Sequence, residues 1–351
     1  MFGLYRTFLA ILVAFSHLVP VPVIGQHAVA GFFVLSGYLM THIMQESYGY
    51  TGGGRGRFVV NRALRLYPSY LATLLLTVAV IAVVGSDATA AFHPYLSLPP
   101  SLSLWLQNLS LVFLDWMPNT VRPRLSPATW ALTTELFYYA LICAGISRSM
   151  RATLVWLVVS IAYHLFANMQ DGDKSLTYFH ILAGSLPFAL GALIYHTKAA
   201  VPRALSSVGS LGWAAVGAIF VIVSGFFALN NEGAAGSGAF YLNILASAGI
   251  VVALKDAAGN RRRDWWSGSF SYHIYILHWI VGFIVISYAL EPLGLAPQRG
   301  VPAFVITVAA CCVISLGLTL WVDKPVEHLR KLVRDRASKS EPELPAASPI
   351  A

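Results

Sequence analysis

Charged residues are scarce in this sequence, at 11% of 351 residues, against about 25% in an ordinary soluble domain. Hydrophobic residues make up 57% of the chain, and its mean hydropathy is +0.67. Apolar runs of about 18 residues or more recur along it, as they do in helices that cross a bilayer. The composition therefore argues against a soluble domain and predicts an all-α, polytopic membrane protein.

Cysteine is also rare, and its placement excludes two kinds of site. Cys143, Cys311 and Cys312 all lie in apolar runs, their number is odd, and two of them are adjacent. No disulfide framework follows from this pattern. No Cys or His pair has the spacing of metal ligands, so we expect no metal site.

Acidic residues are outnumbered, with 15 Asp and Glu against 23 Lys and Arg and a net charge of +8. In a soluble protein this excess would suggest nucleic acid as a partner. In a membrane protein, basic residues accumulate in cytoplasmic loops. We therefore expect the lipid bilayer, and no nucleic acid, as the partner of this charge.

The apolar runs predict a bundle of about ten transmembrane helices. The first run has some marks of a signal peptide, but its small-residue triplet lies too far from the apolar core, so we expect a retained helix. The ten expected spans are 4–23, 27–45, 66–85, 128–147, 151–168, 176–196, 207–229, 238–255, 270–290 and 301–322.

The basic residues predict the orientation of these spans. With the N-terminus in the cytoplasm, 19 of the 23 Lys and Arg fall on the cytoplasmic side, in agreement with the positive-inside rule. We therefore expect a multi-pass protein of the plasma membrane (in bacteria, the inner membrane), with both termini cytoplasmic.

Two segments are not expected to span. The outside loop 86–127 contains an apolar stretch, 102–116, that is short for a span and suggests an interfacial or re-entrant piece. After a membrane domain over 1–325, residues 326–351 read as a cytoplasmic basic segment and a disordered tail.

Ionisable residues inside apolar spans are costly and mark candidate functional sites. His17 lies eleven residues after Arg6, so both side chains project from one helix face, about 16 Å apart along the axis. Glu135 is the only carboxylate well inside a span, and its distance from the outer end of that span matches that of His17. We therefore expect Glu135 and His17 to face each other, as a catalytic pair or as a structural ion pair.

Arg62 and Arg65 share a helix face just before the third span. Two guanidinium groups placed together suit phosphate oxygens, although basic residues at a helix end also bind lipid headgroups. Ser36, beside Gly37, is by default a helix contact, and His278 alone is compatible with a core histidine.

Six blocks of sequence, in order, resemble the motifs of the acyltransferase-3 family of integral membrane O-acyltransferases. The resemblance covers essentially all of residues 1–325, in the stand-alone form without an extracellular hydrolase-like domain. The sequence departs from the family motifs at two places. The Asp that often precedes the first Arg is absent, with Gly3 nearby instead, and Ala131 replaces the Ser that follows the Trp. The blocks are Arg6 with His17, Gly31 to Tyr38, Arg62-x-x-Arg65-x-Tyr67-Pro68, Trp130 to Glu135, Ser271-Tyr272 to His278, and Asp323-Lys324-Pro325.

This resemblance implies transfer of an acyl group, most often acetyl, from cytoplasmic acyl-CoA to a carbohydrate hydroxyl such as that of a cell-surface polysaccharide or its lipid-linked precursor. Acyl-CoA would be the donor substrate, with no permanently bound cofactor. Arg6, Arg62 and Arg65 would bind it, with His17 and Glu135 as the catalytic residues. Further residues expected to line the site are Ser36, Tyr67, Trp130 and His278.

Several alternatives remain open from the sequence. His17 could act as a general base or carry the acyl group itself, and Ser36 is a second possible carrier. Buried ionisable residues in a multi-span protein also suit a proton-coupled transporter or a flippase for lipid-linked sugars. A membrane scaffold or sensor would leave His17 and Glu135 unexplained.

The predicted orientation can be tested with fusions to a reporter that is active only outside the cytoplasm. We expect a signal from fusions within 86–127 and none from fusions after residue 336. A signal from the C-terminal fusions would overturn the topology.

Overall fold

The computed structural model describes residues 1–19, 21–170, 175–197, 215, 217, 238–256, 260–294 and 299–338. Within these residues the chain is helical and contains no strand, so the prediction of an all-α membrane protein is confirmed. The expected span 207–229 lies outside the described residues, except for positions 215 and 217.

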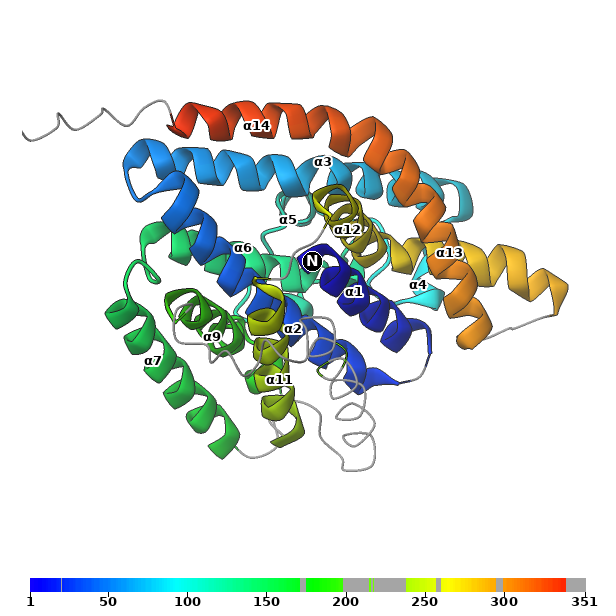
Figure 1. The fold of residues 1–351 in the computed structure, drawn as a ribbon. Coiled ribbons are helices and arrows are strands. Elements are labelled where there is room, and N and C mark those ends of the chain that lie inside the picture. Colours follow the sequence, from blue (N-terminus) through cyan, green and yellow to red (C-terminus); the bar gives the residue numbers. More distant parts are fainter. Residues whose placement is uncertain are drawn as a thin grey trace, which may run out of the picture.

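The described helices form a bundle (Figure 1). In the first half of the chain they are α1 (Phe2–Leu18), α2 (Pro22–Ile43), α3 (Gly52–Val84), α4 (Ser86–Phe92), α5 (Leu102–Ser110) and α6 (Trp130–Ala144). In the second half they are α7 (Met150–Met169), α8 (Ser175–Tyr178), α9 (Ser185–His196), α11 (Gly238–Leu254), α12 (Arg261–Ile284), α13 (Val301–Leu318) and α14 (Lys324–Ser338).

Among the described residues, five helical segments are long and apolar enough to cross a membrane. They are Ile24–Tyr48, Gly52–Val84, Met150–Met169, Arg261–Leu293 and Val301–Arg334. Three shorter apolar helices, of 10–17 residues, accompany them: Phe2–Leu18, Ile181–His196 and Gly238–Leu254. Each coincides with one of the apolar runs that predicted a span.

Two helices, α3 and α12, begin well before the apolar runs 66–85 and 270–290 that predicted spans. The side chain of Thr51 caps α3 by accepting a hydrogen bond from the Gly54 amide, 3.1 Å away. Asn260 caps α12 in the same way, with the amides of Arg262 and Arg263 as donors. A polar cap can begin a helix in water, whereas hydropathy detects only the part that lies in lipid.

Helices that are distant in sequence pack side by side at the centre of the bundle. α1 packs against both α12 and α2, and α2 also contacts α9 and α11. α14 lies along α3 at one edge, as Figure 1 shows. The central position of α1 places its side chains next to those of α2 and α12.

The chain between α5 and α6 is folded into the bundle rather than lying on its surface. Arg124 in this segment is only 2% exposed, and its guanidinium donates to the carbonyl oxygens of Pro118, Val121 and Pro127. The Ser126 hydroxyl donates to Ile276 O of α12, 2.9 Å away. α5 has exposed apolar side chains, such as Leu102 and Leu106, as an interfacial helix would, and the interfacial or re-entrant character of this loop stays a prediction.

Glycines allow α2 and α9 to approach closely. A Cβ on Gly191 would lie 2.0 Å from Val34 O, and a Cβ on Gly37 would lie 2.1 Å from Phe188 O. Small residues permit such contacts between membrane helices. This packing fixes the position of α2, and with it the position of Ser36.

The substitution Gly191→Ala should force these two helices apart. Overpacking of this kind costs about 1–3 kcal/mol, so we expect a lower melting temperature in detergent. The matched control is Gly249→Ala on α11, where an added Cβ meets no atom within 4 Å and alanine is the better helix former. Equal melting temperatures for the two variants would contradict the close packing.

Candidate active site

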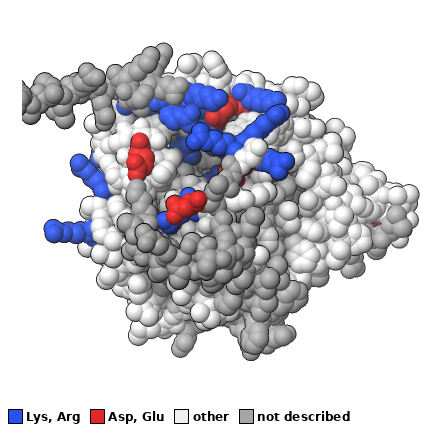
Figure 2. All heavy atoms as spheres, viewed as in Figure 1, with Lys and Arg blue, Asp and Glu red and all other residues white. Residues whose placement is uncertain are grey.

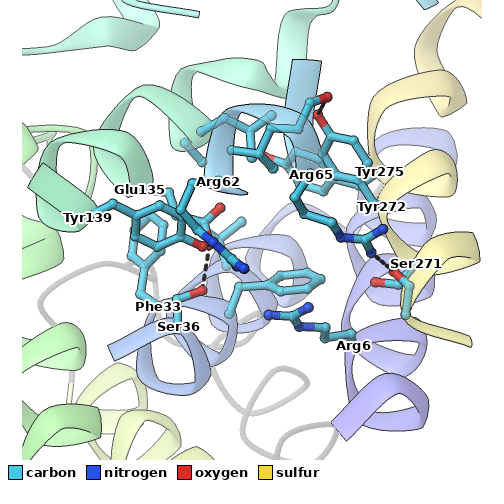
Figure 3. Close-up of a pocket in the computed structure, with 16 residues that line it drawn as sticks. Arg6, Phe33, Ser36, Arg62, Arg65, Glu135, Tyr139, Ser271, Tyr272 and Tyr275 are labelled. Carbon is cyan, nitrogen blue, oxygen red and sulfur yellow. Dashed lines mark hydrogen bonds between the residues drawn. The ribbon is translucent and has the colours of Figure 1, made fainter. Parts of the chain in front are cut away.

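A cavity that is partly open to solvent lies between α1, α2, α3, α6 and α12. Figure 3 shows three arginines directed toward it: Arg6 from α1, and Arg62 and Arg65 from α3. Hydroxyl groups and one carboxylate complete the polar part of the wall, from Ser36, Glu135, Tyr139, Ser271, Tyr272 and Tyr275. The cavity is therefore strongly basic at one end.

Arg65 is held by α12 and by the chain after α13. Its Nη2 donates to Gly268 O at 2.9 Å and its Nη1 lies 3.4 Å from Ser269 Oγ. Asp323 Oδ2 lies 3.7 Å from Arg65 Nη1, and Ser69 donates to Asp323 Oδ1 at 2.7 Å. This guanidinium is therefore fixed in orientation by the protein itself.

Arg62 and Arg6 have fewer partners. Arg62 Nη2 donates to Asn61 Oδ1 at 3.0 Å, but Arg62 Nε is buried without a hydrogen-bond partner. Among the described residues, the Arg6 side chain has neither a hydrogen bond nor an ion pair. Buried guanidinium donors ordinarily find acceptors, so these two groups leave capacity for an anion in the cavity.

Glu135 is bonded to two hydroxyl groups. Ser36 Oγ donates to Glu135 Oε1 at 2.5 Å, and the Tyr139 hydroxyl donates to the same oxygen. Tyr139 follows Glu135 by four residues, a spacing that brings two side chains together on one helix face. Ser36 thus joins α2 to α6 at the cavity wall.

His17 is bonded to another histidine. Its Nδ1 lies 2.8 Å from Nε2 of His278, and His278 Nδ1 lies 3.1 Å from Ile274 O. A carbonyl oxygen only accepts hydrogen bonds, so the neutral His278 carries its proton on Nδ1 and accepts at Nε2. The neutral His17 therefore donates from Nδ1, and its Nε2 is left unprotonated.

The expected pairing of Glu135 with His17 is wrong: the partners of Glu135 are Ser36 and Tyr139, and that of His17 is His278. The prediction assumed that both helices begin at the outer membrane surface. α6 instead begins inside the bundle, where Ala128 accepts a hydrogen bond from Tyr275 at 2.6 Å. Glu135 therefore lines the cavity with the arginines, and His17 does not line it.

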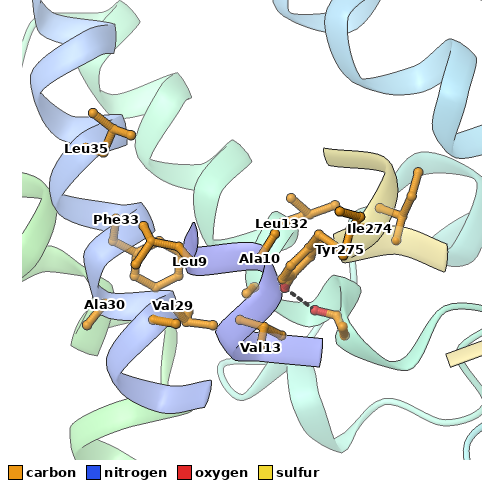
Figure 4. Packing of buried hydrophobic residues seen from close by; sticks show 14 of the residues in the cluster. Leu9, Ala10, Val13, Val29, Ala30, Phe33, Leu35, Leu132, Ile274 and Tyr275 are labelled. Carbon is orange, nitrogen blue, oxygen red and sulfur yellow. Dashed lines mark hydrogen bonds between the residues drawn. The ribbon is translucent and has the colours of Figure 1, made fainter. Parts of the chain in front are cut away.

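An apolar layer lies along α1 between Arg6, which lines the cavity, and His17, which does not. Ala10 and Val13 of α1 pack there with Val29 of α2 and Leu132 of α6, as Figure 4 shows. Tyr275 lines the cavity, and its ring centroid is 6.3 Å from that of His278. Tyr275 is thus the contact between the two halves of the site.

Aromatic and basic groups surround His17 on the far side of this layer. The Trp279 ring lies 4.8 Å from that of His17 and 4.2 Å from that of His93. Arg299 lies over Trp279, 5.0 Å from its centroid. Burial, and then the Arg299 guanidinium, lowers the pKa of His93 to about 4, so this ring is neutral at pH 7.

Two residues expected to line the site lie elsewhere. The Tyr67 hydroxyl donates to Ser110 O at 2.5 Å and so ties α3 to α5. Trp130 packs against the rings of Tyr178 and Phe179. Of the predicted residues, the structure brings these to the cavity: Arg6, Ser36, Arg62, Arg65 and Glu135.

The sequence interpretation missed three residues that complete the site. Tyr139 could have been found from its i, i+4 spacing to Glu135, and Tyr275 from its position one turn before His278. Trp279 carries no such signal, because a tryptophan in an apolar span is by default a packing residue.

Comparison with protein families gives one result that covers most of the chain. The model of the family Acyl_transf_3, described as an acyltransferase domain, matches residues 3–319. Comparisons with curated proteins and with solved structures find no match. α14 lies beyond the matched residues.

Proposed function

The chain belongs to the acyltransferase-3 family and is a membrane acyltransferase, and we propose that it transfers an acetyl group from acyl-CoA to a carbohydrate hydroxyl. The donor is cytoplasmic. The acceptor is a cell-surface polysaccharide or its lipid-linked precursor. The enzyme resides in the plasma membrane, which in bacteria is the inner membrane.

The observation that carries the donor assignment is the unsatisfied guanidinium capacity at the cavity. Arg62 Nε is buried without a partner, and Arg6 faces the same space (Figure 3). The phosphates of CoA supply the anionic oxygens that such donors bind best. The positive-inside distribution of the sequence supports a cytoplasmic position for this end of the bundle, on the side where acyl-CoA is found.

His17 acts as the general base in this proposal. From the arginines, the extended pantetheine arm passes Tyr275 and brings the thioester to the unprotonated Nε2 of His17. The imidazole takes the proton of the acceptor hydroxyl while the hydroxyl oxygen attacks the thioester carbonyl. The C–S bond then breaks, and the imidazolium returns the proton to the departing CoA thiolate.

His278 takes the orienting role that we had expected for Glu135. By accepting from His17 Nδ1 it holds the tautomer in which Nε2 is basic, as the third group does in hydrolytic triads. Glu135 belongs to the donor side, where it forms the cavity wall together with Ser36.

The acceptor approaches His17 from the end opposite the arginines. Trp279 offers an aromatic face there, and Arg299 and His93 offer polar groups. A sugar presents both apolar C–H faces and hydroxyl groups, so this combination suits a carbohydrate. The match to an acyltransferase family favours this proposal over a transporter, a flippase or a scaffold.

The proposal is tested by comparing the purified protein with His17→Ala. We expect the wild-type protein in liposomes to release free CoA from acetyl-CoA when lipid-linked surface glycans are present, and mass spectrometry to find acetylated glycan. His17→Ala should lower this rate by about 10²-fold to 10⁴-fold and keep the wild-type melting temperature. A wild-type protein that consumes no acetyl-CoA would overturn the proposed function.

The orienting role of His278 gives a separate expectation. His278→Ala removes the acceptor for His17 Nδ1, and we expect a loss in kcat of about 100-fold or more. His278→Gln keeps an acceptor oxygen near that position and should retain more activity than His278→Ala. The measurement is acetyl transfer by both variants, with melting temperatures as the control for folding. Equal loss in both variants would show that hydrogen bonding to His17 is not what matters at this position.

A further inference from the structure

α14 brings a fourth arginine to the basic end of the bundle. The helix lies along α3 (Figure 1), and Figure 2 shows Lys and Arg side chains gathered over this part of the molecule. Arg330 is the member of α14 that turns inward, with its side chain 17% exposed. It lies beyond residues 3–319, which the family model matches.

Asn61 joins Arg330 to the cavity arginine Arg62. Its Oδ1 accepts from Arg62 Nη2 at 3.0 Å and from both Nε and Nη2 of Arg330 at 3.3 Å. Its Nδ2 donates to Arg330 O at 3.1 Å. One neutral amide oxygen therefore holds two guanidinium groups side by side, and the side chain of Asn61 is itself buried.

The charges around this oxygen do not balance. Arg330 Nη1 pairs with Glu327 at 2.5 Å, but among the described residues no carboxylate forms an ion pair with Arg62. Two cations that share one uncharged acceptor repel each other, more strongly where water is partly excluded. An anion bound between them would remove this cost and would also accept from the unpaired Arg62 Nε.

We propose that Arg330 and Asn61 form, together with Arg62, a second phosphate subsite that binds the 3′-phosphate of the CoA nucleotide. The inference rests on the proposed function, since it places the outer phosphate of the same donor. A terminal phosphate monoester carries up to two negative charges and presents several oxygens, which suits two guanidinium forks. The subsite is continuous with the donor cavity through Arg62.

The test compares CoA with 3′-dephospho-CoA in calorimetric titrations of the full-length protein, which needs no turnover and no acceptor. We expect the wild-type protein to bind CoA about 10-fold to 100-fold more tightly, as a charge-assisted contact implies. Arg330→Gln should remove most of this preference by weakening CoA binding, with the Kd for 3′-dephospho-CoA unchanged. Arg330→Lys, which keeps the charge but not the fork, should recover only part of it.

The matched control is Lys331→Gln, which removes the same charge from an exposed position on the same helix. It should leave both Kd values unchanged. The subsite would be refuted if Lys331→Gln matched Arg330→Gln, or if Arg330→Gln weakened both ligands equally. A second measurement is the rise in melting temperature that phosphatidylglycerol causes. If Arg330→Gln lost this rise but kept the preference for CoA, the bound phosphate would be that of a lipid, and the subsite would be refuted.

These outcomes are distinct from failure of the proposed function. A protein that binds CoA with the expected preference but transfers no acetyl group would keep the subsite and lose the proposed reaction. A protein that transfers acetyl groups but does not discriminate between CoA and 3′-dephospho-CoA would keep the reaction and lose the subsite.

Discussion

Guanidinium groups inside a membrane protein need acceptors, and this requirement organises the basic end of the bundle. Arg65 obtains its acceptors from Gly268 of α12 and from Asp323, so α3, α12 and the chain after α13 converge on one side chain. Arg124 holds together the segment between α5 and α6 by donating to three carbonyl oxygens within it. Arg6 and Arg62 are the exceptions. Arg62 Nε is buried without a partner, Arg6 is half-buried, and both side chains line the cavity.

The sequence predicted where the described apolar helices lie and which residues form the basic half of the site. Apolar runs located the described spans, because lipid selects for them directly. The search for ionisable residues in those runs found Glu135 and Arg6, and the three-residue spacing just before the third run indicated Arg62 and Arg65. The sequence prediction failed for the partner of His17, because the depth of His17 and Glu135 in the membrane was counted from the ends of their helices. That count holds only if each helix begins at the membrane surface, and α6 begins where Ala128 meets Tyr275. The packing of the preceding segment into the bundle depends on Arg124 and Ser126, which leave no periodic pattern in the sequence.

Tyr275 links the basic half of the site to the histidine half, because it lines the cavity and contacts the ring of His278. Its hydroxyl is held by Ala128 O, and the apolar side chains of Ala10 and Val13 lie beside it on α1 between Arg6 and His17. A continuous wet passage between the cavity and His17 would expose the thioester to water and would also open a path across the bilayer. Exclusion of water strengthens the electrostatic interactions inside a site and prevents competing hydrolysis.

The apolar layer explains why an imidazole pair, rather than an imidazole and a carboxylate, suits the position of His17. A carboxylate beside His17 would need further donors in an apolar and aromatic setting, where an unpaired charge is expensive. His278 accepts the same hydrogen bond as a neutral ring and fixes the same tautomer, with its remaining proton satisfied by Ile274 O. The carboxylate is placed instead where hydroxyl donors from Ser36 and Tyr139 are at hand. The arginines and Glu135 are thereby gathered at the cavity, whereas His17 and His278 pair with each other among aromatic side chains.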